Sequence, residues 1–224
     1  MNEIKARVEQ LRAQMKAHGV DVYIVPTSDF HETEYVCDHF KAREYMSGFT
    51  GSAGTCVFTA DAAKLWTDGR YFIQAAKQLE GSGIELMRMG DEGVLTIEAY
   101  LREALPAHAT LGFDGRVMNT AMVERLCAQL NEVTISCDMD LVGAIWQDRP
   151  ALPASKTFEL AQRYTGKSAA QKLSEVREAM AEAGADIHII TRVDDIAWLL
   201  NMRADDIPCF PVALCYILID QQDA

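Results

Sequence analysis

Apolar and polar residues follow two periods along the chain, and this pattern predicts helices that alternate with short buried strands. In residues 3–18 every third or fourth position is apolar, which is typical of a helix with one buried stripe. Gly19 follows as a helix-ending glycine. Residues 20–25, Val-Asp-Val-Tyr-Ile-Val, are then mostly apolar and predict a strand that ends at Pro26.

The same patterns predict the elements that follow. They are a mixed segment at 30–46, strands at 55–59 and 64–67 that pair as a hairpin, a helix at 70–79, a strand at 84–89, a helix at 94–105, a strand at 109–113, a helix at 119–130, a strand at 133–137 and a short helix at 139–146. The predicted strands are too apolar for a sheet with one face exposed to solvent. We therefore expect an α/β domain whose mixed sheet is flanked by helices.

A second domain repeats the first. Residues 7–25 align without gaps on residues 172–190, so the same amphipathic helix, glycine stop and apolar strand occur twice. Two prolines mark the intervening segment as a linker. The sequence predicts a first domain at 1–147, a linker at 148–156 and the first half of a related second domain at 157–224.

The second copy is much shorter than the first, which suggests a fragment of a longer protein. Its last predicted strand, 212–219, is long and apolar, and its edge lacks the neighbours that a complete domain would supply. Because an open apolar edge pairs readily with another chain, we expect dimerisation or domain swapping through 172–219.

Composition narrows the class of protein. The 224 residues carry a net charge of −12, which argues against nucleic acid and against anionic membranes as partners. The sequence contains neither a signal core nor an apolar run long enough to span a membrane, so the cytoplasm is the expected location. The six cysteines include no Cys-x-x-Cys pair, and several lie in apolar runs, which favours buried free thiols over disulfides or zinc.

Glycines at 48, 51 and 54 form a loop before the predicted strand at 55–59. A phosphate-binding P-loop requires a lysine and a following helix, and this loop has neither. Close approach of the backbone is the better explanation. Gly166-Lys-Ser168 resembles the end of a P-loop, but Ser168 is better explained as a helix N-cap.

Two further segments carry candidate chemistry. Residues 31–35, His-Glu-Thr-Glu-Tyr, begin like a zinc-protease signature but lack its second histidine, so a solvated polar face is expected. In Trp66-Thr-Asp-Gly-Arg-Tyr71, Arg70 either pairs with a carboxylate in a turn or lies at a rim where a carboxylate or peptide end binds. No nucleophile pattern is present, and no residue is assigned as catalytic or metal-binding.

Four segments together resemble a known family. Residues 29–35, 45–55, 65–72 and 201–212 resemble the N-terminal region of Xaa-Pro aminopeptidases, of the three-domain cytosolic type in the creatinase/prolidase superfamily. The resemblance runs nearly from end to end. Phe30 and Phe210 depart from the residues common in the family at those positions.

The resemblance implies two creatinase-like N-terminal domains followed by a catalytic domain. That domain would hold two divalent metal ions, expected to be manganese, and act on peptides with proline in second position. The fragment itself would be inactive, and its role would be to shape the substrate cleft and mediate a homodimer. His31, Asp68 and Arg70 match family motif positions and are the candidate substrate-binding residues.

A second hypothesis stays open, in which the chain is a non-catalytic binding or scaffold module with a creatinase-like fold. The reading frame after Ala224 distinguishes the two hypotheses. A prolidase or creatinase is less compatible with the sequence, because those enzymes have a single N-terminal domain and this chain contains a repeat.

Overall fold

The computed structural model describes residues 3–130 and 132–223, which form two units. Unit 1 comprises Met1–Glu34 and Asp38–Pro150, and unit 2 comprises Tyr35–Cys37 and Ala151–Ala224. Each unit has its own hydrophobic core, so each is described by itself.

Unit 1 is built on a six-stranded sheet with the order β4-β3-β2-β1-β5-β6. The strands are β1 (Val22–Pro26), β2 (Thr55–Thr59), β3 (Ala63–Thr67), β4 (Glu85–Arg88), β5 (Thr110–Phe113) and β6 (Thr134–Ser136). β2 runs antiparallel to β1 and β3, and the other neighbouring pairs are parallel. The predicted mixed sheet and α/β class are confirmed.

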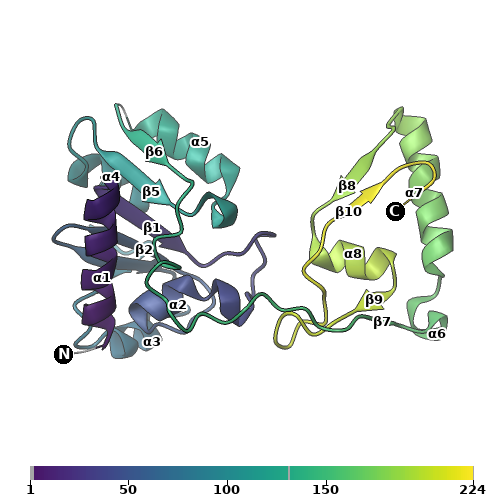
Figure 1. Ribbon diagram of the computed structural model, residues 1–224, viewed down its shortest axis with the longest axis horizontal. Coiled ribbons are helices and arrows are strands. Elements are labelled where there is room, and N and C mark those ends of the chain that lie inside the picture. Colours follow the sequence, from purple (N-terminus) through teal and green to yellow (C-terminus); the bar gives the residue numbers. More distant parts are fainter. Residues whose placement is uncertain (1–2, 131, 224) are drawn as a thin grey trace. The chain divides into compact units, whose positions relative to one another are not determined.

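Helices cover both faces of this sheet (Figure 1). They are α1 (Glu3–His18), α2 (Ala42–Ser47), α3 (Phe72–Gln78), α4 (Ile97–Ala104) and α5 (Thr120–Gln129), with 3-10 turns η1 (Asp38–Phe40) and η2 (Gly115–Val117). Side chains of β1 alternate between the faces. Tyr23 belongs to the cluster of α1, and Ile24 belongs to the cluster of α4 and α5, so β1 is buried on both sides as its apolar run predicted.

The predicted short helix at 139–146 is wrong, because these residues form successive turns. The Asp140 carboxylate accepts a hydrogen bond from the backbone N–H of Gly143 at 2.7 Å and pairs with Arg149. The contact with Gly143 has the geometry of a helix N-cap, and the N–H groups of Ala144 and Trp146 donate to carbonyls four residues back. The N–H of Ile145 donates to Val142 O, three residues back, so no continuous α-helix forms. Apolar periodicity alone does not reveal this change of hydrogen-bond partner.

Unit 2 is small and α/β. Its elements are β7 (Phe158–Glu159), α6 (Gln162–Thr165), α7 (Ala169–Ala183), β8 (His188–Ile190), α8 (Val193–Leu199), β9 (Met202–Arg203) and β10 (Ile217–Ile219). Ser168 caps α7 in a capping box with Gln171, which confirms the predicted N-cap. β8 and β10 pair antiparallel beside α7 (Figure 1), and Met180 of α7 packs on Ile217 and Ile219.

The final strand is shorter than the prediction of 212–219, since only Ile217–Ile219 pair in a sheet. Asp206 is the reason. Its carboxylate accepts hydrogen bonds from the N–H groups of Ser155 and Leu214, both at 2.9 Å. Burial opposes ionisation, but a hydrogen bond from the Ser155 hydroxyl at 2.6 Å and these two backbone bonds hold the pKa of Asp206 below its usual value. The backbone near Leu214 therefore bonds to a carboxylate instead of to a neighbouring strand.

The predictions about membrane-spanning segments and cysteines can be compared with the structure. Within residues 3–130 and 132–223, no helix is both long and apolar enough to cross a bilayer. All six cysteines lie in that part of the chain and carry free thiols. Only Cys37 and Cys56 are buried, so the apolar surroundings of the other four in sequence did not translate into burial.

The two copies of the first strand differ in burial, and this gives a stability prediction. Ile24 is 1% exposed, and its counterpart Ile189 is 59% exposed. We expect Ile24→Ala to lower the free energy of unfolding of unit 1 by about 2–5 kcal/mol through lost burial and a cavity. Ile189→Ala is expected to change that of unit 2 by about 0.5 kcal/mol or less. Native-state hydrogen exchange of β1 and β8 measures each unit separately, and equal losses would contradict the prediction.

Candidate functional site

The carboxyl ends of three parallel strands of unit 1 meet at one edge of the sheet. β1, β3 and β5 run in the same direction, and each is followed within three residues by an aspartate. These residues are Asp29, Asp68 and Asp114. We call the loops that contain them, residues 27–34, 68–71 and 114–119, the carboxyl-edge loops. In open α/β sheets, ligands bind outside this edge.

Asp68 and Arg70 form a closed ion pair at this edge. The backbone N–H of Arg70 donates to Asp68 Oδ1 at 3.0 Å, while Arg70 Nε and Nη2 donate to Oδ1 and Oδ2, each at 2.9 Å. The hydrogen bond from Arg70 lowers the pKa of Asp68, and the same bond raises the pKa of Arg70. The guanidinium is thus held in one orientation, with its side chain 61% exposed.

The loop after β5 repeats this motif as Asp114-Gly115-Arg116. The three corresponding hydrogen bonds from Arg116 to Asp114 measure 3.0, 2.9 and 2.8 Å. This second motif was not predicted from the sequence. The signal was available, because Asp-Gly-Arg follows an apolar strand run at both places.

The two motifs differ in their surroundings. Arg116 also donates to Asp140 at 3.1 Å and lies over the ring of Phe30. A Cβ at Gly115 would lie 2.6 Å from the carbonyl oxygen of Cys137, so only glycine fits there. Arg116 therefore joins three segments of the unit. The corresponding position in the other motif, Gly69, has only a ring atom of Phe72 nearby, at 3.8 Å, and Arg70 is the more exposed guanidinium.

The β1 loop is ordered by Asp29, which is 2% exposed. Asp29 Oδ1 accepts hydrogen bonds from the backbone N–H groups of His31 and Thr33, at 2.8 and 3.0 Å. Glu34 of the same loop contributes to the raised pKa of Arg70. Of the three sequence-predicted site residues, Asp68 and Arg70 are thus in direct contact. His31 lies in the same loop as Glu34, whose negative charge contributes to the raised pKa of Arg70.

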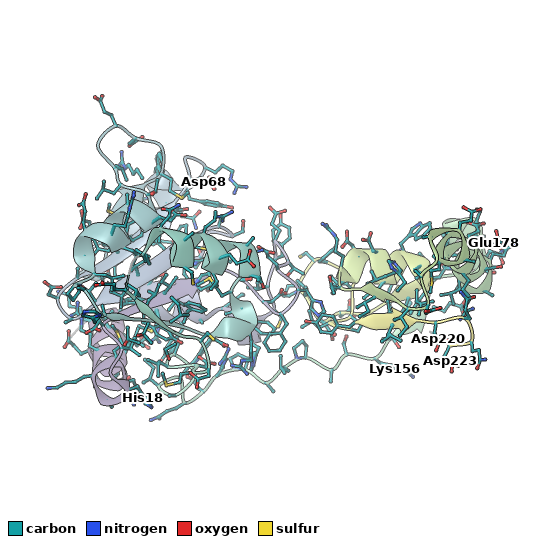
Figure 2. The ribbon with its side chains drawn as sticks, turned by 90° about the horizontal axis from the view of Figure 1, so that it is seen from above. His18, Asp68, Lys156, Glu178, Asp220 and Asp223 are labelled. Atoms are coloured by element: carbon teal, nitrogen blue, oxygen red, sulfur yellow. The ribbon has the colours of Figure 1, made fainter. Side chains whose placement is uncertain are left out.

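A cleft of about 450 Å³ adjoins Asp68. Its walls are mostly apolar and include Trp66, Met89 and Met122, and its acidic side chains are Asp68 and Glu98. Trp66 Nε1 donates to the carbonyl of Leu95 at 2.8 Å, which fixes the indole against one wall. Figure 2 shows Asp68 at the periphery of unit 1.

The glycine loop beside the site is held by Arg43, a buried guanidinium that sequence reasoning also missed. Arg43 is 4% exposed and donates to the carbonyls of Phe49 and Gly51 and to Thr27 Oγ1. A Cβ at Gly51 would lie 2.2 Å from the Phe49 ring and 2.8 Å from Tyr71. The expected close approach is confirmed. An arginine in a short polar helix gave no sequence signal for this contact.

Metal binding was expected only outside this chain. Within residues 3–130 and 132–223, no group of three or more His, Cys, Asp or Glu side chains is arranged to hold a metal ion. The pair of metal ions implied by the family resemblance does not fit the residues described. No chemical step through a metal is therefore assigned to this chain.

Comparison with known proteins identifies the family. Patterns of the creatinase/prolidase N-terminal domain match residues 7–144 and residues 148–224. The chain therefore belongs to the creatinase/prolidase N-terminal domain family. This confirms the resemblance found in the sequence.

The relatives are Xaa-Pro aminopeptidases. The chain is 38% identical over 230 residues to Xaa-Pro aminopeptidase 1 of Dictyostelium discoideum, covering 98% of this chain and 36% of that protein. It is 41% identical over 217 residues to a probable Xaa-Pro aminopeptidase P of Talaromyces marneffei, covering 95% and 33%. The chain thus spans about a third of the length of these relatives.

A solved structure shares the fold. The X-prolyl aminopeptidase of Caenorhabditis elegans, described as a cytosolic enzyme with a di-nuclear active site, matches with a TM-score of 0.90 and 29% identity. The match covers 99% of this chain and 38% of that chain.

The buried guanidinium provides a test of how the glycine loop is held. We expect Arg43→Lys to lower the free energy of unfolding of unit 1 by about 3 kcal/mol, because a lysine leaves buried carbonyl groups without donors. Hydrogen exchange of residues 48–54 should accelerate as well. Arg102→Lys, at an exposed position of α4, is the matched control. A loss equal to that of the control would show that Arg43 does not hold the loop.

Proposed function

We propose that this chain is the N-terminal portion of an Xaa-Pro aminopeptidase, an enzyme that removes an N-terminal residue preceding proline. One observation carries the proposal. Nearly the whole chain aligns with proteins of that name, while it spans about a third of their length. We assign the catalytic residues and the divalent metal ions, expected to be manganese, to the part of the polypeptide that this chain does not span.

The proposed role of unit 1 is to shape the substrate cleft through its carboxyl-edge loops. Arg70 supports this role because its guanidinium is exposed and already oriented by Asp68. That pairing uses the Nε and Nη2 edge, so a ligand carboxylate would approach from the Nη1 side. A peptide carboxylate is the matching ligand, with His31 and Asp68 beside it.

Location and assembly are also proposals. The cytosolic description of the Caenorhabditis elegans enzyme supports a cytoplasmic parent protein. A homodimer of the parent protein stays a prediction that rests on the family resemblance.

The catalytic proposal predicts that the 224-residue chain is inactive. We expect the purified chain, supplied with manganese, to leave an Arg-Pro-Pro peptide intact, whereas a longer polypeptide read from the same frame cleaves it after the first residue. Mass spectrometry of the products measures both. Cleavage by the short chain would overturn the proposal. A stop codon directly after Ala224 would favour the non-catalytic module instead.

The role of Arg70 predicts a change in substrate binding. In the longer active polypeptide, Arg70→Ala is expected to raise KM about tenfold for short peptides with a free carboxylate and to change kcat little, since a charge-assisted hydrogen bond is lost. The same peptides with an amidated terminus should show no such difference. Arg102→Ala serves as the control. An equal effect on free and amidated peptides would contradict the carboxylate contact.

A further inference from the structure

The repeat within this chain extends to individual hydrogen bonds. Arg12 of α1 and Arg177 of α7 occupy matching sequence positions. Arg12 Nε donates to the carbonyl of Thr59 at 3.0 Å, and Arg177 Nε donates to the carbonyl of Asp220 at 2.8 Å. Each arginine thus contacts the end of the second strand of its sheet.

The pairing register of the strands also matches β10 of unit 2 with β2 of unit 1. In unit 1 Ile24 pairs with Val57 across the antiparallel β1 and β2. In unit 2 its counterpart Ile189 pairs with Leu218 across the antiparallel β8 and β10. Counting two residues onward from Val57 and from Leu218 reaches the two carbonyls that the arginines contact. Two independent measures therefore equate β10 with β2.

The turn after each strand is also repeated. In unit 1 Thr59 N–H donates to Ala62 O at 2.9 Å, and Ala62 N–H donates back to Thr59 Oγ1 at 2.8 Å. In unit 2 Asp220 N–H donates to Asp223 O at 3.0 Å, and Asp223 N–H donates back to Asp220 Oδ1 at 2.6 Å. Figure 2 shows Asp220 and Asp223 at this turn. In unit 1 the turn leads directly into β3, which pairs with β2.

The sheet of unit 2 carries an apolar face with a buried counterpart. Ile187, Ile189 and Leu218 are 56%, 59% and 53% exposed. Their counterparts in unit 1 are at most 2% exposed, and they pack with Leu101 of α4 and Leu126 of α5 in one cluster. In unit 1, therefore, helices cover the apolar face that corresponds to the exposed face of unit 2.

We propose that the edge of β10 and this apolar face are the docking surface for the continuing polypeptide. A strand that begins directly after the 220–223 turn pairs antiparallel with β10, and a later helix covers Ile187, Ile189 and Leu218. The lengths of the relatives, about three times that of this chain, leave room for both. This inference goes beyond the proposed function and does not depend on peptidase activity.

The repeat fixes the register of the docking strand. Leu65 of β3 pairs with Cys56 of β2, and both are completely buried. By the same count, the third residue after Asp223 lies opposite Ile217 and is apolar.

An extended chain tests this docking directly. The probe is the 224-residue chain followed by Lys-Leu-Trp-Thr, which copies residues 64–67 of β3 and places leucine opposite Ile217. We expect hydrogen exchange of residues 216–219 to slow at least tenfold relative to the unextended chain. A control extension, Pro-Leu-Trp-Thr, places proline opposite Leu218, where the strand would otherwise donate a backbone N–H to β10, and should give no protection. Exchange at β2 serves as the internal standard.

Two outcomes would overturn the proposal. Equal exchange at 216–219 in all three chains would show that the edge does not accept a strand after this turn. Protection of the unextended chain that rises with concentration, together with dimers in sedimentation, would show that a second copy occupies the surface.

Discussion

The buried guanidinium of Arg43 is the interaction on which the architecture of the site depends. A loop rich in glycine has little side-chain packing of its own, and its carbonyl groups would be costly to bury without donors. Arg43 supplies those donors and stacks on Phe49, which places the loop against Tyr71. Tyr71 directly follows Arg70, so a buried contact near β1 sets the position of an exposed charge after β3.

The duplicated Asp-Gly-Arg motif shows how the same local geometry serves different purposes. Both arginines are oriented by their own aspartate through an equivalent set of three hydrogen bonds. Their further partners differ. Arg116 shares the carboxylate of Asp140 with Arg149, although its side chain is 56% exposed and that of Arg70 is 61% exposed. A local motif therefore fixes a side-chain orientation, and the neighbouring segments determine which further partners the charge meets.

Most of the fold could be predicted from the sequence, because burial follows the apolar periodicity that defines helices such as 3–18 and strands such as 55–59. The failures have local causes. At 212–216 the N–H of Leu214 bonds to the carboxylate of Asp206 instead of to a neighbouring strand. At 139–146 the backbone N–H groups donate to carbonyls three and four residues back, so no continuous helix forms. Asp68 and Arg70 were selected because they match a family motif, and their mutual contact is local because they lie two positions apart. The contacts of Arg43 depend on tertiary structure that no local pattern encodes.

The burial of Cys56 has a consequence for dynamics. Its thiol lies beside Arg43, and burial raises its pKa to about 12, so the reactive thiolate is scarce while the unit is closed. Modification of Cys56 by a thiol reagent requires transient opening of the structure around it. The exposed Cys127 and Cys137 react without that step and report the intrinsic rate. The modification rate of Cys56, compared with the rates of Cys127 and Cys137, therefore measures how often the structure around Cys56 opens.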